Sequence, residues 1–383
     1  MTAEPFSIRI PDAELADLGR RLDATRWPDE IDGADWELGA NLTYMRALTE
    51  YWRNGYDWRR EEAQLNQLPQ FKMNIDGLGI HFVHARGKGH SSLPLIITHG
   101  WPGSFIEMTK LIPLLTDPEA HGGRAEDAFD VVVPSLPGYG FSDHPRERGV
   151  DPQAIAASWT QLMRELGYER FCAQGGDWGS AITLMLGLHH ADHIHGLHLN
   201  YIAGRFLLGP ALSYDPEDAA AKAYSEQLRA WADAEGGYSH QQGTKPQTLG
   251  YGLNDSPVGL AAWIIEKFQS WSDCNDHVEN IFSRDELLTN VMIYWLTLTM
   301  PSAIRLYYES RQRPFVLSRE NFVRPPVAVA LFPKEIPAPP RELAERGMNI
   351  ARWTQMPKGG HFAAMEQPAL LAEDLREFFR AFR

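Results

Sequence analysis

The sequence of 383 residues predicts an α/β fold: a mainly parallel sheet covered by helices, with a helical lid inserted between core strands and an N-terminal extension. From Leu93 onward, short apolar runs of strand length alternate with segments of helical periodicity, which is typical of βαβ units. Between Arg205 and about Arg324 this alternation stops, and the chain becomes Ala-, Trp- and Tyr-rich with a helical pattern. We therefore divide the chain into an N-terminal region over 1–92, a first core part over 93–204, a lid over 205–324 and a second core part over 325–383.

The N-terminal region contains signals for a strand, a helix and a hairpin. The alternating run Phe6–Ile10 predicts a short strand, and Pro11 then opens a helical stretch that continues to Leu22. Two apolar runs at 71–75 and 80–84 flank a short glycine-containing turn, which predicts an antiparallel hairpin. The aromatic residues that crowd this region suit a segment packed against a larger body.

The core is expected to alternate strands with helices. The strands are predicted over 93–98, 129–133, 170–174, 194–199, 327–331 and about 350–356. Helices are predicted between them, for example over 153–166 and 180–189, and a last one from 368 to about 382.

Composition and charge exclude several classes of function. The 36 Lys and Arg against 50 Asp and Glu give a formal charge of −14, so nucleic acid would meet a repulsive field. Only Cys172 and Cys274 are present, which gives no disulfide framework and suits a reducing compartment. The longest apolar run, Val291 to Met300, is too short to span a bilayer, and no signal peptide opens the chain. We expect a cytoplasmic protein without a membrane anchor, and a homodimer is one option for its oligomeric state.

The stretch Gly175-Gly-Asp-Trp-Gly179 lies where a predicted strand runs into a predicted helix. This pattern of small residues around a central residue is typical of a nucleophile elbow, a tight turn that holds its central residue in a strained conformation. Here that residue is Asp177. An Asp that attacks an sp3 carbon forms an alkyl ester, so the expected chemistry is displacement at an epoxide or halide carbon. The alternative, an Asp that merely caps a helix, is disfavoured by the surrounding glycines.

Two further glycine-containing motifs supply partners for Asp177. The stretch Thr98-His-Gly-Trp-Pro-Gly-Ser104 follows the first core strand, where a loop commonly provides one backbone N–H of an oxyanion hole. Trp101 and Trp178, the residue after the nucleophile, are the expected main-chain donors, and an ordinary Pro-Gly turn is the alternative. His361 follows two glycines after the last strand and is the expected base, because it comes last in the chain order nucleophile, acid, His.

The acid that orients His361 should follow the strand before the last. Glu335 is the first acid there, and Glu342 and Glu345 are alternatives on a helix expected to be exposed. Some relatives of this architecture carry the acid after an earlier strand, where this chain has Asn200.

These motifs together resemble those of the α/β-hydrolase-fold epoxide hydrolases, and within them the microsomal-type branch, which includes soluble bacterial and fungal members. The resemblance spans nearly the whole chain and is carried by the stretches Thr25–Pro28, Tyr56–Trp58, His99–Pro102, Gly175–Gly179, Gly196–Asn200, Asn254–Ala262 and Gly359–Ala364. Membrane-bound members carry an N-terminal anchor helix, and we expect none here.

The resemblance implies hydrolysis of a small-molecule epoxide to a vicinal diol without a cofactor. In such enzymes two lid tyrosines donate hydrogen bonds to the epoxide oxygen, and by local motif these are Tyr238 and Tyr307, with Tyr308 as the fallback for the second. An alkoxide leaves poorly unless such donors support it. The expected course is attack by Asp177, followed by hydrolysis of the resulting ester by water that His361 activates.

Two other functions and a metal site are alternatives to this hypothesis. A haloalkane dehalogenase would use the same Asp, His and acid, but paired tyrosine donors favour an epoxide over a halide. A catalytically inactive binder of hydrophobic ligands would not require all the catalytic positions to be filled. A cluster of histidines at His189, His190, His193, His195 and His198 runs from a helix end into a strand. Their side chains should diverge, and no metal is expected.

Overall fold

The computed structural model describes residues 2–89 and 91–383, and within them one nine-stranded sheet has the order β1-β2-β3-β5-β4-β6-β7-β8-β9. The strands are β1 (Glu4–Pro5), β2 (Gln70–Ile75), β3 (Leu78–Ala85), β4 (Leu93–Thr98), β5 (Phe129–Pro134), β6 (Phe171–Gly175), β7 (Ile194–Leu199), β8 (Val323–Leu331) and β9 (Met348–Gln355). Strands β1, β2, β3 and β5 pair antiparallel, and every pair from β5 across to β9 is parallel. The predicted mainly parallel sheet is confirmed.

Helices cover this sheet, as its apolar strands require. The core helices are α4 (Leu111–Thr116), α5 (Pro152–Glu165), α6 (Asp177–His189), α14 (Arg341–Ala344), α15 (Ala363–Glu366) and α16 (Pro368–Phe379). Helices α5 and α6 pack against each other, and so do α4 and α16. Strands β5 to β7 are buried along almost their whole length, which fits a sheet shielded from water on both faces.

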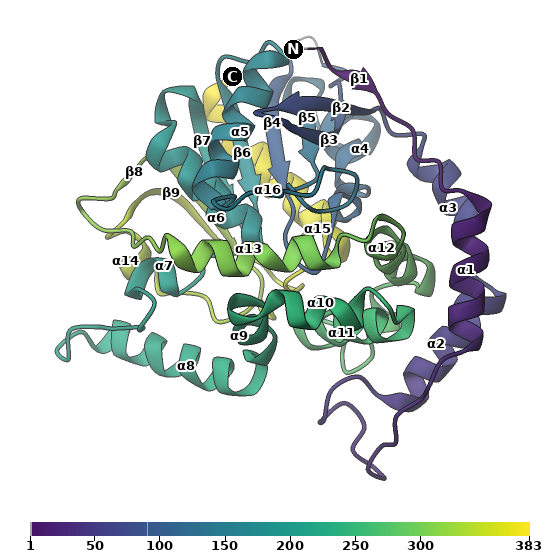
Figure 1. The fold of residues 1–383 in the computed structure, drawn as a ribbon. Helices are drawn as coiled ribbons and strands as arrows, with labels where there is room; N and C mark the ends of the chain where they lie inside the picture. Colours follow the sequence, from purple (N-terminus) through teal and green to yellow (C-terminus); the bar gives the residue numbers. More distant parts are fainter. Residues whose placement is uncertain (1, 90) are drawn as a thin grey trace.

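The described chain between β7 and β8 contains helices and no strand. These helices are α7 (Arg205–Leu208), α8 (Ala219–Glu235), α9 (Gly237–Thr244), α10 (Pro246–Leu253), α11 (Pro257–Trp271), α12 (Arg284–Thr297) and α13 (Met300–Gln312). In Figure 1, α13 crosses the molecule between the sheet and the outer helices α9 to α11, and it packs on α9 and α10. We call α7 to α13 the lid.

No single helix in the described ranges is both long and apolar enough to cross a membrane. Only α12 and α13 taken together reach the required length and composition, and they are bent against each other by 88°.

The N-terminal region adds α1 (Asp12–Asp23), α2 (Leu42–Asn54) and α3 (Trp58–Leu65). The predicted helix at α1 and the hairpin of β2 and β3 are both present, and the hairpin turns at Asp76 and Gly77 with φ of 49° and 86°. In Figure 1 this region, coloured purple, runs along the side of the core and the lid, and α1 and α2 both pack against α11. The N-terminal region therefore bridges the core and the lid.

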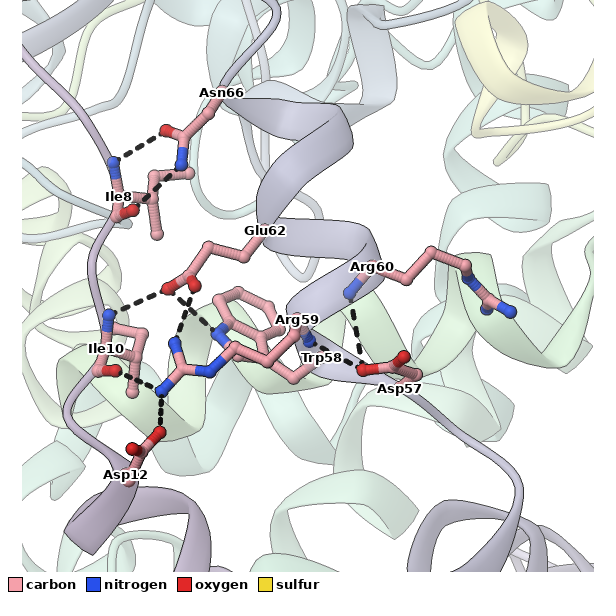
Figure 2. Close-up of polar contacts among 9 residues, drawn as sticks. All are labelled: Ile8, Ile10, Asp12, Asp57, Trp58, Arg59, Arg60, Glu62 and Asn66. Atoms are coloured by element: carbon pink, nitrogen blue, oxygen red, sulfur yellow. Dashed lines mark hydrogen bonds and ion pairs between the residues drawn. The ribbon is translucent and has the colours of Figure 1, made fainter.

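The strand predicted over 6–10 is wrong, because backbone bonding to β2 ends at Phe6, whose amide donates to the Gln70 carbonyl (2.9 Å), and the amides of Ile8 and Ile10 bond to side chains instead. Figure 2 shows the amide of Ile8 donating to Asn66 Oδ1 (2.8 Å), while Asn66 Nδ2 donates back to the Ile8 carbonyl (2.9 Å). The Ile10 amide donates to Glu62 Oε1 (2.7 Å). Ile8 is buried, and so the apolar pattern reflects burial of an extended segment fastened to helix α3.

Small differences at two other elements have local causes. Helix α6 begins at Asp177, earlier than the predicted residue 180, because its first hydrogen bond already runs from the Ser180 amide to the Gly176 carbonyl. Strand β8 begins at Val323, ahead of the predicted 327, and its pairing with β9 shifts register between Val323 and Val327.

Candidate active site

Asp177 lies in the tight turn between β6 and α6 and has a φ of 46°, a left-handed conformation that is unfavourable for a residue other than glycine. Neighbouring glycines are needed because the backbone is packed so closely. A Cβ added at Gly179 would lie 1.9 Å from the Thr98 carbonyl oxygen, and one at Gly100 would lie 2.3 Å from Asp177 Cβ. The turn is thus in close contact with the end of β4 and with the loop that follows it.

His361 lies between two carboxylates. Its Nδ1 is 2.5 Å from Glu335 Oε1, and its Nε2 is 3.6 Å from Asp177 Oδ2. The side chains of His361 and Glu335 are 3% and 2% exposed, so their interaction is shielded from water. Burial alone would lower the pKa of His361, but the charges of Glu335 and Asp177 hold it well above its ordinary value. The two carboxylates therefore favour the protonated form of His361 in the resting site.

The other acids and the amide considered as partners of His361 have other hydrogen-bond partners or are exposed. Asn200 accepts a hydrogen bond from Gln174 Nε2 (2.8 Å). Glu342 is exposed, and Glu345 pairs with Arg341 at the surface (2.7 Å). The structure brings only Glu335 of these candidates to the imidazole.

The main-chain N–H groups of Trp101 and Trp178 belong to the two segments that meet at Asp177. The amide of Trp101 donates to Asp177 Oδ1 (2.8 Å). The amide of Trp178 belongs to the first turn of α6, where N–H groups have no partner within the helix. Of the two amides, only that of Trp101 is hydrogen-bonded to the Asp177 carboxylate among the interactions of the described residues.

Tyr238 from α9 and Tyr307 from α13 bring the lid to this turn. Tyr238 stacks on Trp101 with ring centroids 5.1 Å apart and planes within 6°, and Tyr307 meets Trp178 edge to face at 4.8 Å. The two phenol rings are 5.8 Å apart. Burial and the charge of Asp177 raise the pKa of both tyrosines, so both phenols stay protonated at neutral pH.

Tyr308, the fallback for Tyr307, is directed elsewhere. The guanidinium of Arg148 lies 4.8 Å from the centre of its ring, and Arg148 is an exposed residue. Of the two neighbouring tyrosines, Tyr307 therefore contacts Trp178 beside Asp177, and Tyr308 contacts Arg148.

Comparison with known proteins identifies the family. Residues 3–108 match the family model described as the epoxide hydrolase N terminus, and residues 94–234 match the model of the alpha/beta hydrolase fold. Epoxide hydrolase 1 of Sus scrofa is 39% identical to this chain over 398 residues, which cover 98% of this chain and 88% of that protein. The chain belongs to the epoxide hydrolases.

Solved structures extend this agreement to three dimensions. The epoxide hydrolase of Aspergillus niger has a TM-score of 0.87 at 32% identity, covering 100% of this chain and 97% of that one. The juvenile hormone epoxide hydrolase of the silkworm Bombyx mori also gives 0.87 at 32% identity, covering 100% and 95%. The α/β-hydrolase fold and the resemblance to the microsomal-type branch are both confirmed for this epoxide hydrolase.

Two of the histidines that were considered as metal ligands have hydrogen-bond partners in different parts of this epoxide hydrolase. His198 Nε2 is 2.9 Å from Asp374 Oδ2 in the core, and His193 Nδ1 is 2.8 Å from the Glu169 carbonyl oxygen near the surface. Over residues 2–89 and 91–383, no group of three or more His, Cys, Asp or Glu side chains is arranged to hold a metal ion.

Sequence reasoning missed Glu366, the last residue of α15, which fixes the turn that carries His361. Its Oε1 accepts from the Phe362 amide, and its Oε2 accepts from the amides of Gly360 and Asp273, each at 2.9 Å. Burial raises the pKa of Glu366 to about 7, although the three amides favour the charged form. The available signal was an acid a few residues after His361 in an otherwise apolar stretch.

Glu107 was also missed. It lies in a 3₁₀ turn, Phe105–Met108, is 8% exposed, and lines a small cavity with Asp177 and His361. Burial raises the pKa of Glu107 to about 8. Its signal in the sequence is weak, since it is one acid in an apolar run.

Proposed function

We propose that this epoxide hydrolase opens its substrate by attack of Asp177 on an epoxide carbon and then hydrolyses the resulting ester with a water molecule that His361 activates. The observation that supports this most strongly is the position of His361 between Asp177 Oδ2 and Glu335 Oε1. Aromatic rings of Trp101, Tyr238, Trp271 and Tyr307 contact one another beside Asp177 and favour an apolar epoxide.

In the first step, an oxygen of Asp177 forms a bond to the epoxide carbon as the carbon–oxygen bond of the ring breaks. Tyr238 and Tyr307 hold the departing oxygen, and one phenol transfers its proton to it. The raised pKa of both phenols keeps the proton in place until negative charge develops on the substrate oxygen. The products of this step are a hydroxyalkyl ester of Asp177 and one tyrosinate.

Ester formation then converts His361 from an acid to a base. The charge of Asp177 helps to raise the pKa of His361, and an ester carries no charge, so the pKa of the imidazole falls. The proton that leaves His361 replaces the one that the tyrosine gave up. Neutral His361 can then accept a proton from water.

In the second step, water attacks the carbonyl carbon of the Asp177 ester while His361 Nε2 takes its proton. The amides of Trp101 and Trp178 stabilise the tetrahedral oxyanion, and each such donor contributes about 3 kcal/mol in comparable sites. Collapse of this intermediate breaks the bond between the carbonyl carbon and the diol oxygen. His361 protonates the diol as it leaves, and the regenerated acid of Asp177 returns a proton to His361.

The substitution His361→Gln tests this order of events. It removes the base but leaves the nucleophile, so we expect the variant to be alkylated by styrene oxide and to accumulate the ester. Mass spectrometry of intact protein should show a gain equal to the mass of the epoxide. His189, an exposed residue at the end of α6, supplies the matched control: His189→Gln should turn over normally without retaining mass.

Two results would contradict the proposal: normal turnover by His361→Gln, or no gain of mass in that variant. Adding Asp177→Asn to His361→Gln should abolish the mass gain, and alkylation that persisted in the double variant would place the nucleophile elsewhere.

A further inference from the structure

The small cavity beside Asp177 has room for water and a partly polar lining. Among the residues that line it, Glu107, Gln174, Asp177, Asn200 and His361 are polar. The space that it offers to water centres is about 20 Å³, which is enough for one water molecule. Neither lid tyrosine is among the described residues that line it, so this cavity is separate from the place where the epoxide oxygen is held.

Glu107 is fixed in this cavity by the loop after β4. A Cβ on Gly103 would lie 1.7 Å from Glu107 Oε1, so the carboxyl group occupies the space that any other residue at position 103 would fill. None of the ion pairs within the described residues includes Glu107. A buried acid without a cationic partner is costly to the fold, and such groups are concentrated at sites of chemistry.

Glu107 also interacts electrostatically with both partners of the hydrolysis step. Burial raises its pKa most, and the negative charge of Asp177 raises it further. The positive charge of His361 and hydrogen bonding from the backbone of Gly100 and Ser104 act in the opposite direction. The carboxyl group therefore responds to the charge state of the nucleophile and of the base.

We propose that Glu107 is a further catalytic residue, whose carboxylate accepts a hydrogen bond from the water molecule that attacks the Asp177 ester. This inference rests on the proposed function. One O–H of the water gives its proton to His361 Nε2, and the other donates a hydrogen bond to Glu107, which gains no proton in the step.

Two charges near Glu107 change before hydrolysis, and they act in opposite directions. Ester formation removes the negative charge of Asp177, which lowers the pKa of Glu107, whereas loss of the proton from His361 removes a positive charge, which raises it. As His361 accepts the proton of the attacking water, its positive charge again favours the carboxylate of Glu107, and this carboxylate in turn orients the water and stabilises the imidazolium.

The test separates the two chemical steps in Glu107→Gln. With styrene oxide in single turnover, we expect ester formation within about threefold of the wild-type rate and ester hydrolysis slowed about tenfold or more. The ester should accumulate on intact protein, and the pH dependence of hydrolysis should lose the inflection that ionisation of Glu107 gives. Glu119→Gln, an exposed acid in another 3₁₀ turn, is the matched control and should behave as wild type.

A purely structural role predicts a different result. Burial raises the pKa of Glu107 from 4.5 in the unfolded chain to about 8 in the folded chain. Between these two pH values the folded chain keeps a proton that the unfolded chain has lost. The free energy of unfolding therefore falls as pH rises through that range. Glu107→Gln should therefore raise the thermal midpoint at pH 8 while it slows hydrolysis. A role limited to the fold would lower the midpoint and slow both steps alike.

Unchanged ester hydrolysis in Glu107→Gln, or equal slowing of both steps, would overturn the inference. If Glu107→Gln does not fold, Glu107→Asp is the second variant, because it keeps the acid but shortens the side chain. Glu107→Asp should slow ester hydrolysis and retain the pH inflection. A wild-type rate of ester hydrolysis in Glu107→Asp would also overturn the inference. The proposed function fails separately, through His361→Gln. If that variant accumulates ester while Glu107→Gln hydrolyses it normally, only the role of Glu107 is lost.

Discussion

The phenol groups of Tyr238 and Tyr307 contact the ring systems beside Asp177, whereas Tyr308 contacts Arg148 outside the site. We predict that Tyr238→Phe and Tyr307→Phe each slow ester formation by about ten- to a hundredfold, because each removes one donor to the epoxide oxygen. Tyr308→Phe is the matched control and should leave the rate unchanged. Single-turnover measurements with a quench in acid give these rates.

The same tyrosines determine the behaviour at high pH. Their pKa values are raised by burial and by Asp177, so they remain proton donors well above neutrality. Ester formation should therefore show no loss attributable to them below about pH 10, the ordinary pKa of Tyr. An alkaline decline centred near pH 8, present in wild type and absent in the Phe variants, would be inconsistent with this environment.

The individual residues show where a sequence is informative. Asp177 and His361 could be found because the glycines beside them are required by close backbone packing, which leaves a mark in the sequence. Glu335 followed from its place after β8. Glu107 and Glu366 were not found, because each is a single acid in an apolar stretch and its hydrogen-bond partners cannot be identified from the sequence.

Helix α15 and the turn before it act as one unit through Glu366. We predict that Glu366→Gln lowers kcat by about tenfold or more with a smaller change in KM, because one amide-accepting oxygen becomes an NH₂ group that faces backbone donors and displaces His361. The neighbouring acid Glu373 on α16 is half exposed and pairs with Arg376, so Glu373→Gln is the matched control. Steady-state kinetics of both variants decide the matter, and equal kcat values would remove Glu366 from this role.

The secondary structure was predictable where periodicity and burial coincide. The central strands were found because strands buried on both faces are continuous apolar runs. The segment over 6–10 was misassigned because it has the alternation of a strand, while the backbone of Ile8 and Ile10 bonds to the side chains of Asn66 and Glu62 far along the sequence. Periodicity reports which side chains are buried and carries no information about what the backbone bonds to.

Asp285, at the start of lid helix α12, joins the lid to the N-terminal region. Its Oδ1 accepts from Tyr51 Oη (2.7 Å) and its Oδ2 pairs with Arg60 Nη2 (2.5 Å). We predict that Asp285→Ala lowers the midpoint of thermal unfolding by about 1–3 °C and leaves kcat/KM at 25 °C within about twofold, because the lost contacts are partly exposed and distant from Asp177. Differential scanning fluorimetry with the exposed Asp233→Ala as control measures the shift. Equal midpoints for both variants would show that this contact does not fasten the lid.

The arrangement of the N-terminal region on the rest of the molecule was beyond sequence reasoning. Its aromatic residues indicated that it packs on a larger body, but the partners, such as Met292 for the Trp52 indole (3.3 Å) and Thr289 for Tyr56 (3.0 Å), belong to the lid. Such contacts join residues more than two hundred positions apart, and no local pattern identifies them. The sequence predicted the sheet and the helices that cover it, but it did not predict the contacts that join the N-terminal region to the lid.

The hydrogen bond from Trp101 to Asp177 makes two chemically identical oxygens unlike each other. Oδ1 is anchored to the main chain, while Oδ2 lies toward the imidazole. If the diol departs with the oxygen that attacked, the protein gives up one of its own atoms in each cycle and restores it from solvent in the next step. Each product molecule would then carry an atom that entered the enzyme during an earlier turnover, and the anchored oxygen would be exchanged only when the carboxylate rotates.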